Sequence, residues 1–178
     1  GHWTSVDDGG PAFKVDATKW SGSTQRADLD RIGRSLFPNV SEEFLTDSSA
    51  AGAFPLAVWG PTSDFRDGTL RVQFKLIAGA SDQTAGIVLG LKPSGSYMFV
   101  RYNTKDGNVA LWEYAGGQRK VVAHGHHKTQ LAMNTWHELR VTIAGTKLHG
   151  AVDRDSLTVK HTLDQPVTGR VGLWTKRD

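Results

Sequence analysis

The chain has 178 residues, no cysteine, and 21 Lys and Arg against 18 Asp and Glu, which gives a formal net charge of +3. This length suits one domain with a sizeable core, and the lack of cysteine excludes disulfides, thiolate nucleophiles and cysteine metal sites. Basic residues are scattered and are not interleaved with stacking aromatic residues, so we expect no nucleic-acid partner. The chain shows neither a signal-peptide pattern nor an apolar run long enough to span a bilayer, so we expect no membrane span.

The first third of the chain predicts short strands followed by helices. Residues 1–22 predict one or two strands joined by a turn at 7–11, which is rich in Asp, Gly and Pro. Residues 25–37 have apolar side chains at helical spacing, and Pro38 is a stop signal. A second short helix is predicted from Ser41, because two Glu follow it in the first turn.

The remainder of the chain predicts short strands separated by turns. Leu70, Val72 and Phe74 alternate with polar residues, which predicts a strand with one buried face. Strands are predicted at 57–59, 69–77, 86–91, 97–102, 109–114, 118–124, 136–143, 148–152, 157–162 and 170–175. Links this short require antiparallel pairing. The sequence therefore predicts an all-β, two-sheet antiparallel sandwich as a single domain over 1–178, with 21–50 as a helical or loop insertion.

Two predicted strands carry side chains that suit a polar ligand. Alternation places Tyr97, Arg101 and Asn103 on one face, where they combine aromatic surface with a guanidinium and an amide. On the last strand, Trp174 and Lys176 likewise share a face. These five residues are the predicted binding residues. The alternative is a solvated outer face with ordinary cross-strand pairs.

Six tryptophans raise the possibility of a stacking platform, because an indole face packs on the C–H face of a sugar ring. Core packing is the more usual role of tryptophan, and it stays open for those in or beside predicted strands. These are Trp59, Trp112, Trp136 and Trp174.

Metal sites have little support in the sequence. His124, His126 and His127 cluster, but no third ligand follows at a recognisable spacing, so we expect no metal there. The segment Asp153-Arg154-Asp155 predicts a hairpin turn, although such oxygens can also hold a structural Ca²⁺. No other cofactor is expected.

Catalytic residues are not assigned by the sequence. A sandwich glucanase needs two carboxylates on one strand in a Glu-x-Asp-x-Glu pattern, and this pattern is absent. Of the four Glu, Glu42 and Glu43 are adjacent near a predicted helix start, whereas Glu113 and Glu138 lie on separate strands.

Several predicted strands carry familiar motifs. They are F-x-D-G-T-L-x-V-x-F-K at 65–75, D-Q-x-A-G-I-V at 82–88, V-R-x-N at 100–103, D-x-N-V-x-L at 106–111, W-H-x-L-R-V at 136–141 and G-R-V-G-L-W-T-K at 169–176. Together they resemble bacterial secreted proteins of the concanavalin A-like jelly-roll superfamily, and most closely the 3-keto-disaccharide hydrolase domains near the laminin G-like domains. The chain departs from that group at Thr84-Ala85-Gly86, where the group has Asn-Ser-Gly, and at Gly90, where it has Arg.

The resemblance implies a jelly roll exported to the periplasm or the exterior, with a carbohydrate ligand on a concave sheet face bearing Arg101, Asn103, Trp174 and Lys176. It leaves two alternatives open. One is hydrolysis of 3-keto glycosides, where a base such as His137 or Glu138 would remove a proton made acidic by the ketone. The other is a non-catalytic laminin G-like interaction domain. The resemblance also implies a further strand after Lys176. The oligomeric state is not predicted.

Overall fold

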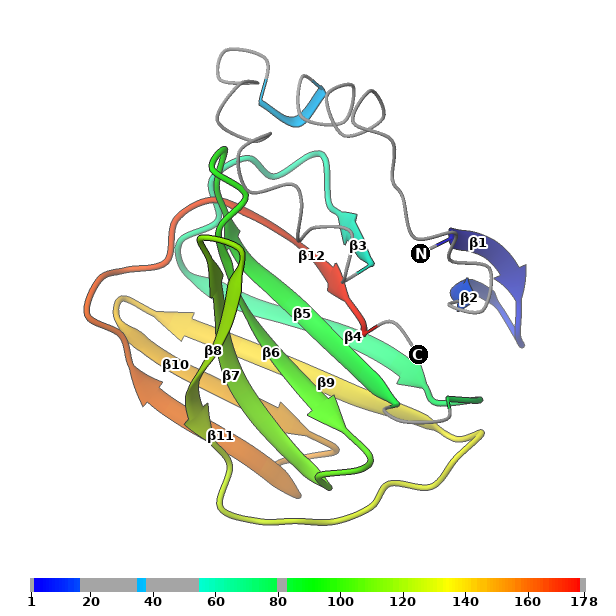
Figure 1. Cartoon of the computed structure of the whole chain (residues 1–178). Helices are drawn as coiled ribbons and strands as arrows, with labels where there is room; N and C mark the ends of the chain where they lie inside the picture. Colours follow the sequence, from blue (N-terminus) through cyan, green and yellow to red (C-terminus); the bar gives the residue numbers. More distant parts are fainter. Residues whose placement is uncertain (1, 17–34, 38–54, 80–82, 177–178) are drawn as a thin grey trace.

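Two antiparallel sheets pack face to face in the computed structural model, which describes residues 2–16, 35–37, 55–79 and 83–176 (Figure 1). The six-stranded sheet has the order β3-β12-β5-β6-β7-β8, and the four-stranded sheet has the order β11-β10-β9-β4. The strands of the sandwich are β3 (Leu56–Val58), β4 (Gly68–Lys75), β5 (Thr84–Leu91), β6 (Tyr97–Asn103), β7 (Asn108–Ala115), β8 (Gln118–His124), β9 (Trp136–Ala144), β10 (Lys147–Val152), β11 (Leu157–Thr162) and β12 (Arg170–Trp174). The predicted all-β sandwich is confirmed, with strand ends shifted by a residue or two.

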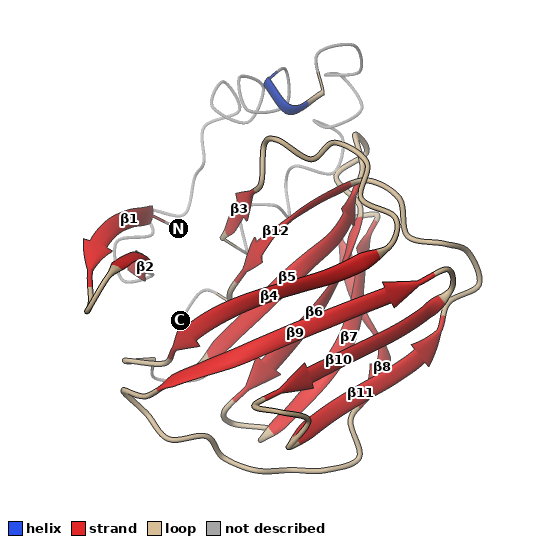
Figure 2. Ribbon diagram, turned by 180° about the vertical axis from the view of Figure 1, so that it is seen from behind, coloured by secondary structure: helices blue, strands red, loops and turns tan. Residues whose placement is uncertain are grey.

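The core lies between the two sheets and is filled by alternating residues from both. The four-stranded sheet, seen in front in Figure 2, contributes Phe74, Leu139 and Val141, all of which are buried. Leu70 and Val72 face the same core but are half-buried, because β4 is an edge strand of its sheet. The six-stranded sheet contributes Ile87, Leu89, Val100, Tyr102, Val109, Leu111 and Val171. Burial of these side chains is the main stabilising contribution to the sandwich.

The N-terminal segment forms a separate hairpin of β1 (His2–Asp7) and β2 (Pro11–Asp16), as the turn at 7–11 predicted. The Asp7 carboxylate accepts a hydrogen bond from the backbone N–H of Gly10 at 2.9 Å, which closes the turn. An ion pair between Asp8 and Lys75 connects the hairpin to β4. The hairpin lies to one side of the sandwich in both ribbon views.

The helices predicted at 25–37 and from Ser41 lie almost entirely outside the described residues. Of the first helix only residues 35–37 are described, and Ser35 and Leu36 are helical there. No helix in the described part of the chain is long and apolar enough to cross a membrane. The strand predicted after Lys176 stays a prediction, because residues 177 and 178 are not described.

Candidate functional site

The outer face of the six-stranded sheet, which points away from the four-stranded sheet, is divided into an aromatic half and a polar half. Strand β6 crosses both halves. Its alternation turns Val100 and Tyr102 into the core and turns Phe99, Arg101 and Asn103 outward. The strand therefore changes from aromatic to polar along one face, as the sequence pattern predicted.

The aromatic half is a second small core. Phe99 stacks on Trp174 with ring centroids 4.3 Å apart, and Tyr97 stacks on Tyr114 at 5.1 Å. Gly86 makes this packing feasible, because a Cβ there would lie 3.2 Å from the Trp174 ring. The partly buried side chains that pack against this cluster are Phe37, Leu56, Val58 and Trp112.

Two of the predicted binding residues belong to this aromatic half. Tyr97 is only 3% exposed and Trp174 only 1% exposed. Burial raises the pKa of the Tyr97 phenol well above its ordinary value, and the side chain of Trp174 opposes this shift in part. A phenol with so high a pKa stays neutral and is no general base near neutral pH.

The polar half is organised by one carboxylate. The Oδ2 atom of Asp106 accepts hydrogen bonds from Arg101 Nη2 at 2.8 Å and from Asn103 Nδ2 at 3.1 Å. The Oδ1 atom of Asn103 in turn accepts a bond from the backbone N–H of Lys105 at 3.0 Å. Because the turn after β6 carries Asp106 back over its own strand, the guanidinium and the amide are held in fixed orientations.

These residues line a pocket of about 540 Å³, which we call the polar pocket. Its volume lies within the range of ordinary small-molecule sites. The lining residues come from β5, β6, β7, β8, the turn after β6, the loop after β8 and the segment after β12: Thr84, Arg101, Asn103, Lys105, Asp106, Asn108, Trp112, Arg119, His124, Gly125, Lys128 and Lys176.

Trp112 forms the aromatic part of the polar pocket. The Arg119 guanidinium lies 4.5 Å from the centre of its ring, and that of Arg101 lies 5.3 Å away. The His124 ring meets the indole edge-on at 6.4 Å. Trp112 thus joins the two halves of the outer face, because Phe99 stacks on it at 6.4 Å from the aromatic side.

A β-bulge decides that His124 faces this pocket. Trp112 pairs with Val121, but the register shifts by one residue beyond it, so that Ala110 pairs with His124. If the pairing were regular, with Val122 opposite Leu111, His124 would lie opposite the core residue Val109 and face the core, since a one-residue slip exchanges the two faces of a strand.

The loop between β8 and β9 closes one end of the polar pocket and carries Lys128. It is attached to the turn after β6, because the backbone N–H of Thr129 donates to the carbonyl of Gly107 at 2.7 Å. The Tyr102 hydroxyl also binds the loop, donating to the Thr129 carbonyl at 3.1 Å and accepting from the Leu131 N–H at 2.9 Å. These bonds place Lys128 at the pocket independently of its side-chain contacts.

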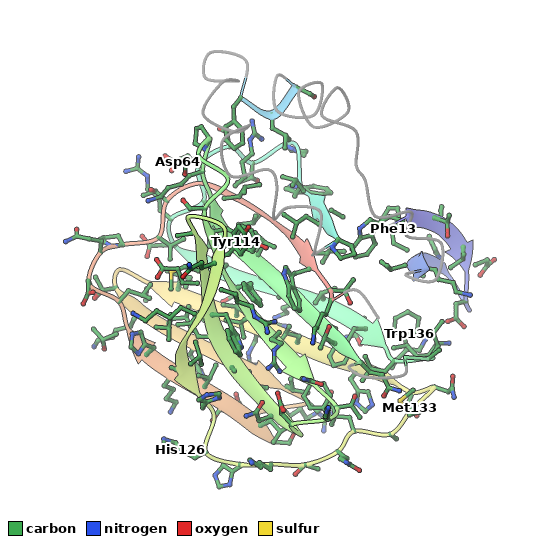
Figure 3. The ribbon with its side chains drawn as sticks, in the orientation of Figure 1. Phe13, Asp64, Tyr114, His126, Met133 and Trp136 are labelled. Carbon is green, nitrogen blue, oxygen red and sulfur yellow. The ribbon has the colours of Figure 1, made fainter. Side chains whose placement is uncertain are left out.

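A second cavity of about 690 Å³, the hairpin cleft, lies between β1–β2 and the strands β4, β5 and β12. Its aromatic side chains include Phe13, which is 70% exposed, and Trp136, which is 43% exposed; Figure 3 shows both on the hairpin side of the molecule. The Lys75 ammonium lies 5.2 Å from the centre of the Trp136 ring. Trp174 lines this cleft, and Lys176 lines both cavities.

The structure therefore brings together three of the five predicted binding residues. Arg101, Asn103 and Lys176 line the polar pocket, whereas Trp174 reaches only the hairpin cleft and Tyr97 lines neither cavity. The predicted site residues did not include Lys105, Asp106, Asn108, Arg119 or Lys128. Hairpin pairing across the Asp106-Gly107-Asn108 turn could have placed Asn108 beside Asn103. The position of Lys128 depends on the path of the loop after β8, which the sequence does not predict.

The two base candidates lie on the four-stranded sheet. His137 faces the core side, with Nδ1 hydrogen-bonded to Asp153 at 2.5 Å and Nε2 to the Ala132 carbonyl at 3.0 Å. Glu138 is on the opposite face of β9, where Gln73 donates to its carboxylate at 3.5 Å. Neither residue lines the polar pocket.

The segment Asp153-Arg154-Asp155 forms the predicted hairpin turn between β10 and β11, with φ angles of 43°, 56° and 68°. Both carboxylates bind protein groups: Asp153 accepts from the backbone N–H of Glu138, and Asp155 from Arg140 at 2.7 Å. Within the described residues, no group of three or more His, Asp or Glu side chains has the arrangement of a metal site. The predicted option of a structural Ca²⁺ stays untested.

Several solved structures have a similar fold. The carbohydrate-binding module CBM66 from Bacillus subtilis matches with a TM-score of 0.60 and 16% identity, over 70% of this chain and 75% of that chain. The chain has a concanavalin A-like jelly-roll fold. This confirms the jelly-roll fold that the sequence motifs indicated, whereas closeness to the 3-keto-disaccharide hydrolases stays a prediction.

Weaker matches have TM-scores below one half. Chicken galectin 2 gives 0.46 with 12% identity, over 62% of this chain and 84% of that chain. A Bacillus licheniformis β-glucanase gives 0.42 with 18% identity, over 64% of this chain and 55% of that chain. No protein-family model and no curated protein sequence matches this jelly roll.

Proposed function

We propose that this jelly roll binds a carbohydrate in the polar pocket. The observation that carries the proposal is the convergence of the Arg101–Asp106–Asn103 network and the Trp112 indole on one cavity of the outer face. The aromatic side chains of the other half are buried against one another, whereas Arg101 and Asn103, although also buried, line the polar pocket.

The chemistry of the pocket suits sugar hydroxyls. A hydroxyl both donates and accepts hydrogen bonds, and the pocket offers guanidinium and ammonium donors, amides with both functions and the Asp106 carboxylate as an acceptor. The network around Asp106 fixes these groups before a ligand arrives, which reduces the entropy lost on binding. The half-buried indole of Trp112 adds an apolar wall for the C–H groups of a ring.

The fold adds independent support, because the solved structure with a TM-score of 0.60 is named as a carbohydrate-binding module. Hydrolysis of 3-keto glycosides has less support, since His137 and Glu138 lie on the other sheet. Export to the periplasm or the exterior remains part of the proposal. A laminin G-like role in protein binding is a competing outcome of the test below.

Binding should first be sought on a glycan array and then measured by calorimetric titration of a bound glycan. Arg119→Ala removes an exposed donor from the pocket and Lys176→Ala removes a half-buried one. Each is expected to weaken binding by roughly two- to fivefold. Arg101→Ala, which also leaves Asp106 without a guanidinium partner, is expected to weaken it by roughly tenfold or more.

Lys120→Ala is the matched control, because Lys120 is exposed on the same strand as Arg119 but does not line the pocket. Thermal unfolding of each variant separates lost binding from lost folding. Glycan binding that survives all three pocket variants would place the site elsewhere. An array without any bound glycan would reject carbohydrate binding.

A further inference from the structure

The charge of the polar pocket differs from that of the whole chain. Over the full sequence, 21 basic residues are nearly balanced by 18 acidic ones. The pocket is lined by five basic residues and, among the described residues, by a single acidic one, Asp106. The basic residues are Arg101, Lys105, Arg119, Lys128 and Lys176.

These cations come from separate parts of the chain that the fold brings together. Arg101 lies on β6, Lys105 in the turn after it, Arg119 on β8, Lys128 in the following loop and Lys176 just after β12. Like charges gathered in one cavity repel one another, and the cost is offset when an anion binds. A neutral sugar would leave this repulsion in place.

The backbone holds several of these cations at the pocket. The N–H of Lys105 donates to Asn103 Oδ1 at 3.0 Å, and the N–H of Lys176 donates to Thr84 Oγ1 at 3.0 Å. The residue after Lys128 is bonded to Gly107 at 2.7 Å. The fold therefore fixes the backbone positions from which Lys105, Lys128 and Lys176 reach the pocket.

We propose that the ligand of the polar pocket is an acidic saccharide, one whose rings carry carboxylate or sulfate groups as well as free hydroxyls. This inference rests on the proposed carbohydrate binding and names its substrate class. The cations bind the anionic groups, with the arginine fork suited to their paired oxygens. Thr84, Asn103 and Asn108 supply the hydroxyl and amide groups that a bare anion would not need.

The test uses matched pairs of oligosaccharides: galacturonate oligomers with their carboxyl-reduced forms, and sulfated oligomers with their desulfated forms. The acidic member of at least one pair is expected to bind roughly tenfold or more tightly than its neutral partner. Its affinity should fall as ionic strength rises from about 0.01 M to about 1 M, because the Debye length shrinks from about 30 Å to about 3 Å.

A charge-matched pair of variants tests the residues. The double variant Lys105→Ala with Lys128→Ala removes two exposed cations from the pocket. Its affinity for the acidic saccharide should be roughly tenfold lower, which is the combined effect of two exposed ion pairs. Lys120→Ala with Lys160→Ala removes the same charge from exposed positions outside the pocket and should change the affinity by less than about twofold.

Each other outcome rejects a defined part of the inference. Equal binding of acidic and neutral members would overturn the acidic ligand and leave carbohydrate binding standing. Absence of binding to every saccharide, acidic or neutral, would overturn both proposals. Polyglutamate, a polyanion without sugar hydroxyls, should bind more weakly than the acidic saccharide; equal affinity would show that the pocket recognises charge and not a sugar.

Discussion

The two faces of the six-stranded sheet are formed by the same strands but differ in their chemistry. The inner face is apolar along its length and packs on the four-stranded sheet. The outer face is a buried aromatic cluster at one end and a basic pocket at the other. This difference shows that alternation assigns side chains to a face, whereas the elements lying over that face decide whether a polar or aromatic side chain is buried.

The largest expected effect tests whether the aromatic half of the outer face stabilises the fold as a hydrophobic core does. Phe99 is fully buried and stacks on Trp174, so Phe99→Ala should lower the free energy of unfolding by about 3–5 kcal/mol. Urea unfolding gives the value. Lys120→Ala, at an exposed position, should stay within about 0.5 kcal/mol of the wild type. Equal midpoints in the two variants would mean that the aromatic half does not stabilise the fold.

A second prediction concerns the loop that closes the polar end of the same face. A Cβ on Gly125 would lie 2.4 Å from the Thr158 carbonyl oxygen and 2.9 Å from that of Val109. Gly125→Ala must therefore displace backbone on two sides and should cost about 1–3 kcal/mol of stability, measured in urea. It should also weaken glycan binding, because the loop carries Lys128. Gly60→Ala is the matched control, because a Cβ on Gly60 has no atom beyond its chain neighbours within 4 Å. An equally large loss of stability in this control would refute the steric explanation.

The pH dependence of stability tests the burial of the aromatic half, because this half contains the buried phenol of Tyr97. Burial raises the pKa of Tyr97 in the folded state, so the unfolded chain loses this proton first as pH rises. The stability from the neutral phenol is complete below the ordinary pKa of about 10, and it falls above that pH by at most about 1.4 kcal/mol per pH unit.

Tyr97→Phe removes this titration. Urea midpoints of the wild type should decline more steeply above about pH 10 than those of the variant, while the difference between the two should stay constant near neutral pH. Parallel declines in the two proteins would show that Tyr97 is not the group responsible.

The smallest expected loss of stability comes from a substitution in the polar half. Arg119 is exposed and its guanidinium lies 4.5 Å from the Trp112 ring, so Arg119→Ala should cost only about 0.5–1 kcal/mol of stability. Thermal unfolding measures this loss, and the same variant tests binding. A stability loss as large as that of Phe99→Ala would mean that the polar half belongs to the structural core, and the comparison between the two halves would fail.

The sequence by itself determined the strands and their faces, because two-residue alternation and turn residues are local signals. Leu70, Val72 and Phe74 were assigned to the core side in this way, and Arg101 and Asn103 to one outer face. The Asp106-Gly107-Asn108 turn likewise indicated its hairpin. These assignments need only chain geometry, in which neighbouring side chains point to opposite faces.

Only the tertiary structure decided which outward residues join the aromatic cluster and which line the polar pocket. Trp174 and Tyr97 share a face with Arg101 and all three are buried, but side chains from distant segments pack against the aromatic pair, whereas Arg101 lines the pocket. The bulge at Val122 turned His124 toward the pocket, and hydrogen bonds of Thr129 with the Tyr102 hydroxyl and the Gly107 carbonyl brought Lys128 to it. Such contacts join residues far apart in the chain, and local propensity carries no information about them.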